Sequence, residues 1–316
     1  MPSPLYLIYL EWPEKCFRIS TDDLRYLRTL VPKGSRVVRV RDDTGFMRAL
    51  PRATHAIVWR FRREWFARAS RLRVLATPAA GQELVPTAGP PGVTIHFGHY
   101  HGAIMAESVA GFMLAWSRGF FAVRYAPPRV AAWPRTWLSE RCAEVAGTTA
   151  VIAGYGHAGR AIGRQLAALG VTVYGITRHG IFAGDRHLAG VTRARLLKKA
   201  DWFVLALPST TGTDNFLGAA LLKQLPRRCV VINVGRGNAI DERALLAALR
   251  AHRLAGAYLD VCKREPTLNP DGRRQPSMAV DDSGLPPNCI VMPHASAFSP
   301  LYLRRCFKEL KDDWCL

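Results

Sequence analysis

The sequence predicts an α/β protein built from two domains. At 316 residues the chain is long enough to bury two hydrophobic cores. Short runs rich in β-branched and aromatic residues alternate with helical segments, which indicates βα units with parallel strands. One glycine-rich loop, residues 154–159, stands between such a run and a helical segment, where a doubly wound sheet has its ligand-binding turn.

The first domain is expected to be the smaller one, a flavodoxin-like α/β domain of residues 1–102 to which residues 296–316 return. Its β-rich runs are residues 5–10, 36–40, 55–60 and 72–76. Candidate helices lie between the runs, such as Thr21–Leu30 and Glu64–Ser70, and a later helix over Leu301–Leu310 returns to this domain. The first apolar run is short and has no basic leader, so we expect a strand and not a signal peptide.

The second domain, residues 103–295, is expected to be a Rossmann-type doubly wound parallel sheet. It opens with a long apolar helix from about Ala103. Its clearest later helices are Arg160–Leu169 and Glu242–His252. Six apolar runs separated by helical segments are typical of such a sheet. These runs are Thr148–Ala153, Val171–Ile176, Trp202–Leu207, Cys229–Asn233, Gly256–Asp260 and Cys289–Met292.

Composition limits the class of protein. No apolar stretch reaches the ~20 residues that a membrane-spanning helix needs. The seven cysteines are scattered without a C-x-x-C pair, which favours free thiols and a cytoplasmic location. The net charge of +20 arises from 36 Arg and 8 Lys against 24 acidic residues, and such a surface attracts anions. Because the basic residues are dispersed, an Arg-rich composition explains this charge better than a nucleic-acid partner does.

The glycine loop lies in the context that dinucleotide binding requires. It follows the strand at residues 149–153 and opens the helix that continues through Arg160. Glycine permits a tight turn and close approach to a pyrophosphate, while the helix N-terminus offers free N–H groups. A merely structural turn is the alternative. The loop consists of Gly154, Tyr155, Gly156, His157, Ala158 and Gly159.

The strand that follows the glycine loop indicates which dinucleotide binds. In NAD-binding domains this strand ends in an acidic residue that binds the ribose hydroxyls. Here it ends in Thr177 and Arg178, so no carboxylate repels a 2′-phosphate and a guanidinium is at hand. The sequence therefore favours NADP(H) over NAD(H). The alternative is that Arg178 is a solvated surface residue.

Three further segments each follow an apolar run, and each carries one reactive side chain. They are residues 233–237, 260–266 and 293–294, and they carry Arg236, Glu265 and His294. The carboxyl ends of parallel strands meet at one sheet edge, so we expect these side chains to converge. Reduction of a 2-oxo acid needs an arginine for the substrate carboxylate, a histidine to protonate the carbonyl and a carboxylate to keep that histidine charged.

Together these segments resemble the D-isomer-specific 2-hydroxyacid dehydrogenase family, in particular its glyoxylate and hydroxypyruvate reductase branch. The resemblance covers roughly residues 53–294. It implies that Arg236, Glu265 and His294 form the catalytic set. It also implies that Asp260 binds the nicotinamide carboxamide. Formate dehydrogenases of this superfamily carry glutamine where Glu265 stands, so the glutamate favours an oxo-acid reaction. Further cofactor contacts implied by the resemblance are Leu207, Pro208, Thr213, Val234 and Gly235.

The resemblance also implies substrate contacts in the first domain. The segment 74–82 is similar to the family loop whose amides grip the substrate carboxylate, which gives Ala79, Ala80 and Gly81. The acidic residue that usually follows the glycines of this family loop is displaced, because Gln82-Glu83 stands there. Trp59 is expected either to line the pocket or to pack in the core. His101 stands at the expected hinge, where it either reaches the substrate or is a loop histidine without a role. With no cysteine or carboxylate nearby to complete a set, it and the neighbouring His96 and His99 predict no metal site.

The resulting hypothesis is an NAD(P)H-dependent reductase of a small 2-oxo acid that forms the D-2-hydroxy acid, with His294 as general acid. The alternative is a dinucleotide-sensing binding protein like the transcriptional corepressors of this fold. The helix at residues 103–118 is apolar around much of its circumference, and the resembling family pairs its cofactor domains through this helix. We therefore expect a homodimer.

Overall fold

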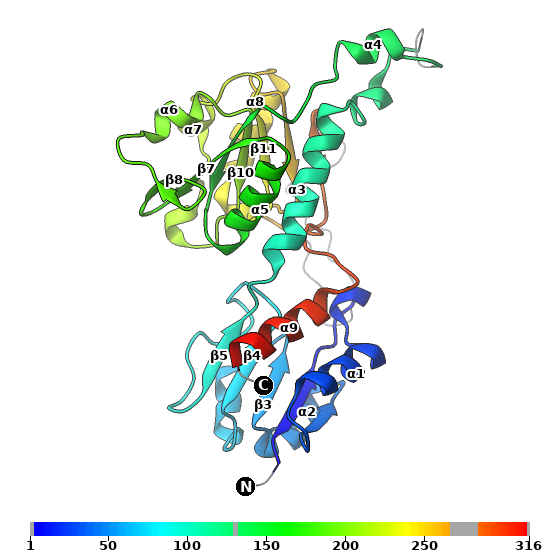
Figure 1. Ribbon diagram of the computed structural model, residues 1–316, viewed down its shortest axis with the longest axis vertical. Coiled ribbons are helices and arrows are strands. Elements are labelled where there is room, and N and C mark those ends of the chain that lie inside the picture. Colours follow the sequence, from blue (N-terminus) through cyan, green and yellow to red (C-terminus); the bar gives the residue numbers. More distant parts are fainter. Residues whose placement is uncertain (1–2, 129–131, 266–283, 315–316) are drawn as a thin grey trace. The chain divides into compact units, whose positions relative to one another are not determined.

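The computed structural model describes residues 3–128, 132–265 and 284–314 of the chain. It divides into two compact units, each of which has helices packed on a mainly parallel sheet (Figure 1). The first unit is Met1–His101 with Phe298–Leu316, and the second is Gly102–Ala297. The predicted α/β class is confirmed.

The first unit contains a five-stranded parallel sheet with the order β2-β1-β3-β4-β5. This is the strand order of flavodoxin-like folds, as expected for the smaller domain. The central strand β1 is buried along its whole length, so its sequence is continuously apolar. The strands are β1 (Leu5–Tyr9), β2 (Arg36–Arg39), β3 (His55–Val58), β4 (Val74–Thr77) and β5 (Thr94–Phe97).

Among the described residues, the first unit also contains three α-helices and three 3-10 helices. The first helix begins with a capping box, in which Ser20 and Asp23 satisfy each other's backbone N–H groups. The segment predicted as a helix over 64–70 is a 3-10 helix, because the adjacent rings of Trp65 and Phe66 both pack on Phe61. The helices are α1 (Thr21–Leu30), α2 (Asp43–Ala49), α9 (Tyr302–Trp314), η1 (Lys15–Phe17), η2 (Leu50–Arg52) and η3 (Arg63–Arg68).

The second unit contains an eight-stranded sheet with the order β13-β12-β11-β10-β6-β7-β8-β9. All pairings from β13 to β7 are parallel, which confirms the Rossmann-type doubly wound sheet. The six predicted strands are present as β6 (Thr149–Ala153), β7 (Thr172–Thr177), β10 (Trp202–Leu205), β11 (Val230–Asn233), β12 (Gly256–Leu259) and β13 (Cys289–Val291).

The sheet has an antiparallel edge that the sequence analysis did not predict. Strands β8 (Gly180–Ala183) and β9 (Arg186–His187) add to β7 as consecutive hairpins. Both are short, and the turn between β7 and β8 is Arg178-His179, which lacks the Asn-Gly type of signal that identifies a hairpin from sequence. The sheet is therefore mixed and not entirely parallel.

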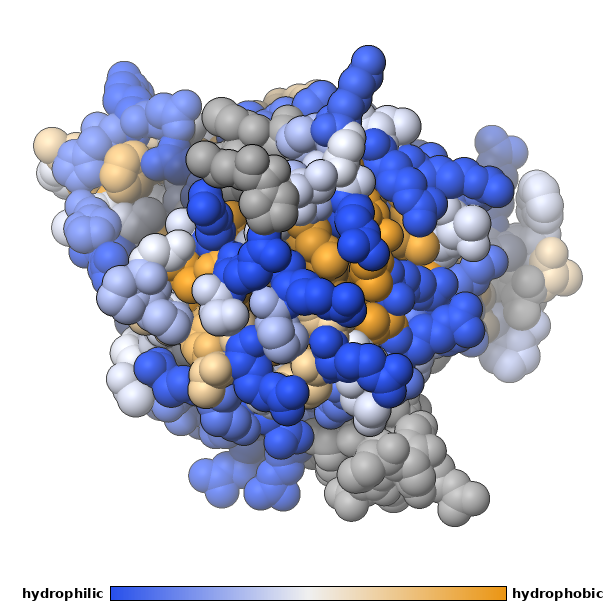
Figure 2. Space-filling view, turned by 90° about the horizontal axis from the view of Figure 1, so that it is seen from below, coloured by the Kyte–Doolittle hydropathy of each residue, from blue (hydrophilic) through white to orange (hydrophobic). Residues whose placement is uncertain are grey.

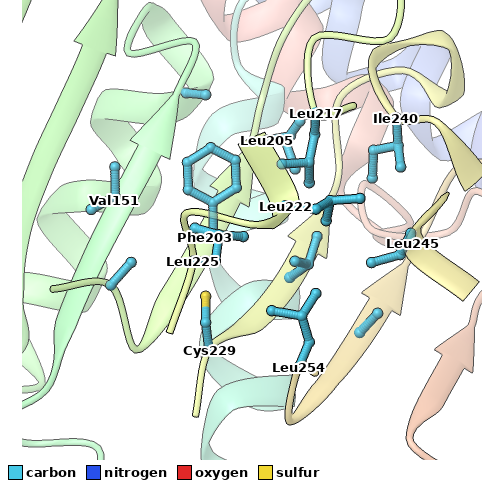
Figure 3. Close-up of a cluster of buried hydrophobic side chains, with 14 of the residues drawn as sticks. Val151, Phe203, Leu205, Leu217, Leu222, Leu225, Cys229, Ile240, Leu245 and Leu254 are labelled. Carbon is cyan, nitrogen blue, oxygen red and sulfur yellow. The ribbon is translucent and has the colours of Figure 1, made fainter. Parts of the chain in front are cut away.

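Helices cover both faces of the second sheet. On one face, α7 and α8 bury a cluster of side chains that includes Phe203, Leu222 and Leu245 (Figure 3). On the other, α3 and α5 pack on the same strands through Val109, Met113 and Ile162. The helices are α3 (His101–Ser117), α4 (Arg135–Ser139), α5 (His157–Ala168), α6 (Arg193–Leu197), α7 (Ala219–Leu222), α8 (Glu242–Arg250), η4 (Ala122–Tyr125), η5 (Thr211–Thr213) and η6 (Gly237–Ala239).

Within the described part of the chain, no helix has the length and apolar character needed to cross a membrane. The six cysteines described there are all free.

Candidate functional site

The carboxyl-terminal edge of the second sheet is built from loops that touch backbone to backbone. Gly154, after β6, has a φ of 90°, and a Cβ on it would lie 2.5 Å from the carbonyl oxygen of Ala206. A Cβ on Gly235 would lie 2.6 Å from backbone atoms of Leu207, and one on Gly237 would overlap the backbone of Cys262. Only glycine fits these positions, so the ends of four strands form one continuous surface.

The glycine loop forms a cradle at the start of α5. The helix begins at His157, and its N-cap Gly156 offers no side chain to the first N–H groups. A helix N-terminus that follows a glycine N-cap in this way is the arrangement that binds a pyrophosphate. A Cβ on Gly159 would overlap the carbonyl of Gly154, whereas one on Gly156 meets nothing within 4 Å. The loop therefore fits a dinucleotide.

Tyr155 holds the glycine loop against the sheet. Its side chain is 4% exposed and lies over two glycines, Gly163 of α5 and Gly175 of β7, at each of which a Cβ would overlap the ring. The N–H groups of Gly154 and Tyr155 both donate to the carbonyl of Ile176, at 3.0 and 3.2 Å. The end of β7 is thereby fixed beside the cradle.

Arg236 follows β11 in a turn that a buried side chain shapes. Asn233 is 1% exposed; its Nδ2 donates to the carbonyl of Arg236 at 3.1 Å and its Oδ1 accepts from the N–H of Gly235 at 3.1 Å. The half-buried Arg236 donates through Nη1 to the carbonyl of Gly235 at 3.0 Å. Asn233 thereby shapes the turn that carries the arginine, a role that was not expected from the sequence.

His294 and Glu265 are in direct contact, with 2.8 Å between Nδ1 and Oε2. Their side chains are 47% and 39% exposed. The hydrogen bond to Glu265 raises the pKa of His294 above its ordinary value, against the opposing effect of burial. Burial acts to raise the pKa of Glu265, but the bond and charge of His294 outweigh it and hold that pKa below its usual range.

Arg236 lies close enough to act on both members of this pair. Its positive charge contributes to the low pKa of Glu265 and opposes, without overcoming, the rise in the pKa of His294. The structure thus brings together the arginine, the carboxylate and the histidine at one sheet edge. With the imidazole charged and the arginine beside it, this edge can bind an anion and deliver a proton.

Asp260 fixes the loop that carries His294. Its carboxylate is 1% exposed and accepts from the N–H groups of Ala295 at 2.8 Å and Ser296 at 3.0 Å. Its carbonyl accepts from the N–H of His294 at 2.8 Å. His294 itself has a φ of 54°, in the left-handed region that non-glycine residues seldom adopt. The predicted cofactor contact therefore has a structural task that the sequence did not indicate.

Comparison with known proteins identifies the family. Residues 110–296 match the model of the D-isomer specific 2-hydroxyacid dehydrogenase, NAD binding domain. The chain belongs to the D-isomer specific 2-hydroxyacid dehydrogenase family. It is therefore an oxidoreductase that uses a nicotinamide cofactor, and the corepressor-like alternative is not supported.

Two relatives of this dehydrogenase match most of its length. The glycerate dehydrogenase of Methylorubrum extorquens is 32% identical over 250 residues, which are 77% of this chain and 74% of the relative. The glyoxylate reductase of Korarchaeum cryptofilum is 29% identical over 245 residues, which are 75% of this chain and 70% of that protein.

Solved structures of the family share the fold. The NAD complexed form of the D-isomer specific 2-hydroxyacid dehydrogenase from Lactobacillus delbrueckii ssp. bulgaricus matches with a TM-score of 0.76 at 18% identity, covering 98% of this chain and 95% of that one. The NADPH-dependent glyoxylate/hydroxypyruvate reductase from Sinorhizobium meliloti, in complex with NADP and sulfate, matches with a TM-score of 0.69 at 26% identity, covering 97% and 93%.

Other predicted cofactor contacts of the dehydrogenase lie at the ends of β10 and β11. The hydroxyl of Thr213 donates to the carbonyl of Pro208 at 2.7 Å, which closes the loop after Leu207. Val234 is 2% exposed, and its N–H donates to the carbonyl of Leu205 at 3.0 Å. Leu207 and Gly235 meet at the backbone contact described above.

The predicted substrate residues belong to the first unit. Trp59 is 7% exposed, donates through Nε1 to the carbonyl of Phe17 at 2.9 Å, and borders a pocket of about 200 Å³ together with Trp12 and Arg60. The burial of Trp59 shows that it packs in the core of the first unit, and its role as a substrate contact stays a prediction. Ala79, Ala80 and Gly81 form the bend after β4.

His101 is more deeply enclosed than a substrate contact at a hinge would suggest. It is 7% exposed, and its Nε2 lies 2.8 Å from the hydroxyl of Tyr302 in α9. The rings of Tyr100 and His101 are stacked with centroids 4.3 Å apart. Among the described residues, no three His, Cys, Asp or Glu side chains are grouped so as to hold a metal ion.

Proposed function

We propose that this dehydrogenase reduces a small 2-oxo acid, of the glyoxylate or hydroxypyruvate type, to the D-2-hydroxy acid. The observation that carries the proposal is the 2.8 Å contact between His294 and Glu265 on the sheet edge that also holds the glycine cradle and Arg236. The relatives named glycerate dehydrogenase and glyoxylate reductase support a substrate of this size.

His294 serves as the general acid. Because Nδ1 faces Glu265, the proton available to a substrate is the one on Nε2. The reduced nicotinamide, when bound, supplies the hydride. His294 donates its proton to the carbonyl oxygen as charge develops there, and Glu265 stabilises the imidazolium before transfer.

Arg236 holds the substrate carboxylate. A guanidinium fork matches a carboxylate with two parallel hydrogen bonds, which fixes the direction of the neighbouring carbonyl. The turn built by Asn233 directs this side chain. This orientation of the substrate raises the reaction rate, since misplacement of the reacting groups by ~1 Å can lower that rate by about 10²-fold.

We further propose a division of labour between the two units. The second unit binds the dinucleotide through residues 154–159 and the ends of β7, β10, β11 and β12. The first unit binds the substrate through Trp59, Ala79, Ala80, Gly81 and His101, the last acting through its contact with Tyr302. The free cysteines support a reducing, cytoplasmic environment.

NADP(H) is the proposed cofactor in preference to NAD(H). Arg178 is exposed, and no acidic side chain follows β7 before Asp185, which pairs with Arg160. A 2′-phosphate therefore meets positive charge at the end of this strand. The relative from Sinorhizobium meliloti, described as NADPH-dependent and solved with NADP, supports this choice.

Loss of NADPH absorbance in the presence of glyoxylate or hydroxypyruvate tests the proposed activity. We expect turnover with at least one of them, and His294→Ala should lower kcat by about 10²–10⁴-fold while cofactor affinity is kept. His252→Ala, which removes an exposed histidine with the same left-handed backbone, is the matched control. No turnover with any small 2-oxo acid, or near-normal turnover in His294→Ala, would refute the proposal.

A further inference from the structure

The bend after β4, residues 78–81, is held at its first two residues by neighbouring parts of the first unit. The hydroxyl of Thr77, which is 0% exposed, accepts from the N–H of Ala79 at 3.2 Å. The N–H of Gly98, which follows β5, donates to the carbonyl of Ala79 at 3.0 Å. A Cβ on Gly98 would overlap the carbonyl oxygen of Pro78, so β5 ends in close contact with the bend.

Two tyrosines and a histidine connect the bend to α9. The hydroxyl of Tyr100 donates to the carbonyl of Pro78 at 3.2 Å. Tyr302 is the first residue of α9, and its ring meets the ring of Tyr100 edge-on with centroids 5.1 Å apart (Figure 1). The hydroxyl of Tyr302 lies 2.8 Å from Nε2 of His101. Both Tyr302 and His101 are buried, so water competes little for these bonds.

The hydroxyl of Tyr100 keeps its proton. Burial is the main cause that raises the pKa of Tyr100 well above its ordinary value, and the nearby thiol of Cys306 and the charge and hydrogen bond of Tyr302 raise it further. The bond to the carbonyl of Pro78 is therefore donated by a neutral phenol.

The hydrogen bonds of this series run in one direction. A hydroxyl has one proton to donate, and Tyr100 donates its proton to Pro78, because a carbonyl can only accept. The bond between the two tyrosine hydroxyls therefore uses the proton of Tyr302. Nε2 of His101 must in turn donate to Tyr302, which fixes the tautomer of the imidazole. Bonds arranged head to tail strengthen one another, so loss of the Tyr302 hydroxyl weakens the bond on Pro78.

We infer that Tyr302 is a positioning residue for substrate binding. From α9 it orients the hydroxyl of Tyr100, which holds the carbonyl of Pro78 and thereby directs the N–H groups of Ala80 and Gly81 to the substrate carboxylate. The inference rests on the proposed reduction of a small 2-oxo acid and on the proposed substrate contacts of the bend. In this role Tyr302 acts through Tyr100 and does not itself touch the substrate.

The first test is Tyr302→Phe, which removes the hydroxyl and keeps the ring that packs on Phe17 and Trp59. A bend that binds the carboxylate equally in the ground state and the transition state changes KM and not kcat. We expect KM for glyoxylate or hydroxypyruvate to rise about fivefold, the size of one hydrogen bond, while kcat and the Kd for NADPH are unchanged. The inhibition constant of oxalate, a dicarboxylate of the size of glyoxylate, should rise by the same factor.

The matched control is Tyr6→Phe. Tyr6 is 1% exposed, lies on β1 of the same unit and stacks on His55, so the substitution removes another buried tyrosine hydroxyl. We expect it to leave KM and the inhibition constant of oxalate unchanged.

A double-mutant cycle shows whether Tyr302 acts through Tyr100. Tyr100→Phe removes the bond to Pro78 directly and should raise KM about tenfold. The variant with both substitutions should bind no more weakly than Tyr100→Phe alone, because the hydroxyl of Tyr302 then has no partner hydroxyl to orient. Independent effects would multiply to about fiftyfold, and that result would overturn the inference.

The outcomes separate this inference from the proposed function. Wild-type turnover together with a Tyr302→Phe variant that has a lower thermal midpoint but the wild-type KM would show that the hydroxyl only stabilises the fold. The positioning role would then be refuted, and the proposed function would stand. Absence of wild-type turnover with both oxo acids would refute the proposed function and the inference with it. A rise in KM that Tyr6→Phe does not share and that disappears in the Tyr100→Phe background supports the role of Tyr302.

Discussion

The contact between His294 and Glu265 gives the two directions of the proposed reaction opposite pH dependences. Reduction needs His294 in its protonated form, and the pKa of His294 is raised. The kcat/KM for reduction should therefore be maximal at low pH and fall as the pH rises through this raised pKa. Oxidation of the hydroxy acid needs the neutral ring and should rise over the same range. Glu265→Gln removes the negative charge and should move both limbs to lower pH.

Profiles of kcat/KM against pH in both directions check this prediction. Glu242→Gln is the matched control, because Glu242 is a half-buried carboxylate that accepts a backbone hydrogen bond from Lys263. A Glu265→Gln profile that coincides with the wild type would contradict the assignment of Glu265.

Asp260 gives a second prediction for a single residue. Asp260→Asn removes the charge of a buried carboxylate that accepts hydrogen bonds from the two backbone N–H groups after His294, so the loop should lose its fixed position. We expect kcat to fall about 10²-fold and the free energy of unfolding to fall by about 1–3 kcal/mol. Stopped-flow turnover and urea unfolding measure the two effects. A stability loss without any change in kcat would show that the loop does not position the histidine.

The convergence of Arg236, Glu265 and His294 could be predicted from the sequence, but the contacts that hold them in place could not. Arg236, Glu265 and His294 each follow an apolar run, and parallel strands bring their carboxyl ends to one edge. Asp260 binds N–H groups that are 35 and 36 positions away in the chain, and Asn233 binds its own turn. Backbone partners of this kind leave no pattern of residue types in the sequence.

The glycines that join the strand-end loops give a prediction about whole elements. Gly237→Ala would drive a Cβ into the backbone of Cys262, so the ends of β11 and β12 must separate. We expect a loss of roughly 2–4 kcal/mol in unfolding free energy and loss of turnover, since Arg236 and Glu265 lie on these loops. Gly212→Ala, where the nearest atom is the Thr210 hydroxyl at 4.0 Å, should leave the thermal midpoint almost unchanged. Equal midpoints for the two variants would contradict the packing described.

Strands could be predicted where burial imposes a run of apolar residues on the sequence. All six parallel strands lie where apolar runs stand, because strands covered by helices on both faces cannot alternate with polar residues. The hairpin of β8 and β9 is short, lies at the edge of the sheet and is partly exposed, so it has no such run. The 3-10 helix at Arg63–Arg68 follows from aromatic contacts that residue periodicity does not reveal.

At the scale of the molecule, four of the eight large apolar side chains that are exposed among the described residues lie between residues 114 and 133; the other four are Leu84, Met292, Phe298 and Leu301. Among the described residues, Leu114 is 40% exposed, Phe120 68%, Val123 41% and Trp133 81%. Single exposed hydrophobic residues are ordinary, but a group of this kind marks an interaction surface. We propose that it pairs two copies of the chain, beginning at the exposed stripe of α3.

Light scattering should therefore give twice the 35.0 kDa mass of the chain at micromolar concentration. Leu114→Lys places a charge in the proposed interface and should shift the equilibrium to the monomer by at least tenfold in dissociation constant. Leu84→Lys is the matched control, because Leu84 is 43% exposed and lies in the other unit. A wild-type particle of monomer mass would rule out the dimer.

Basic residues, which give the chain its net charge of +20, are found in both units. Hydrophilic side chains cover most of the face seen in Figure 2 and surround a smaller hydrophobic area. Basic residues occur in both units, among them Arg28 and Lys33 in the first and Arg195 and Arg227 in the second. This distribution agrees with a compositional origin of the charge.

The left-handed backbone of His294 has a consequence for how the enzyme can change. A non-glycine residue at a φ of 54° carries a conformational cost of about 1 kcal/mol that glycine would not. Under the proposed mechanism the imidazole is required for turnover. The conformational cost is therefore retained for as long as natural selection maintains the reaction. A search for stabilising substitutions that ignored turnover would select glycine at this position. The protein that it selected would be more stable but inactive.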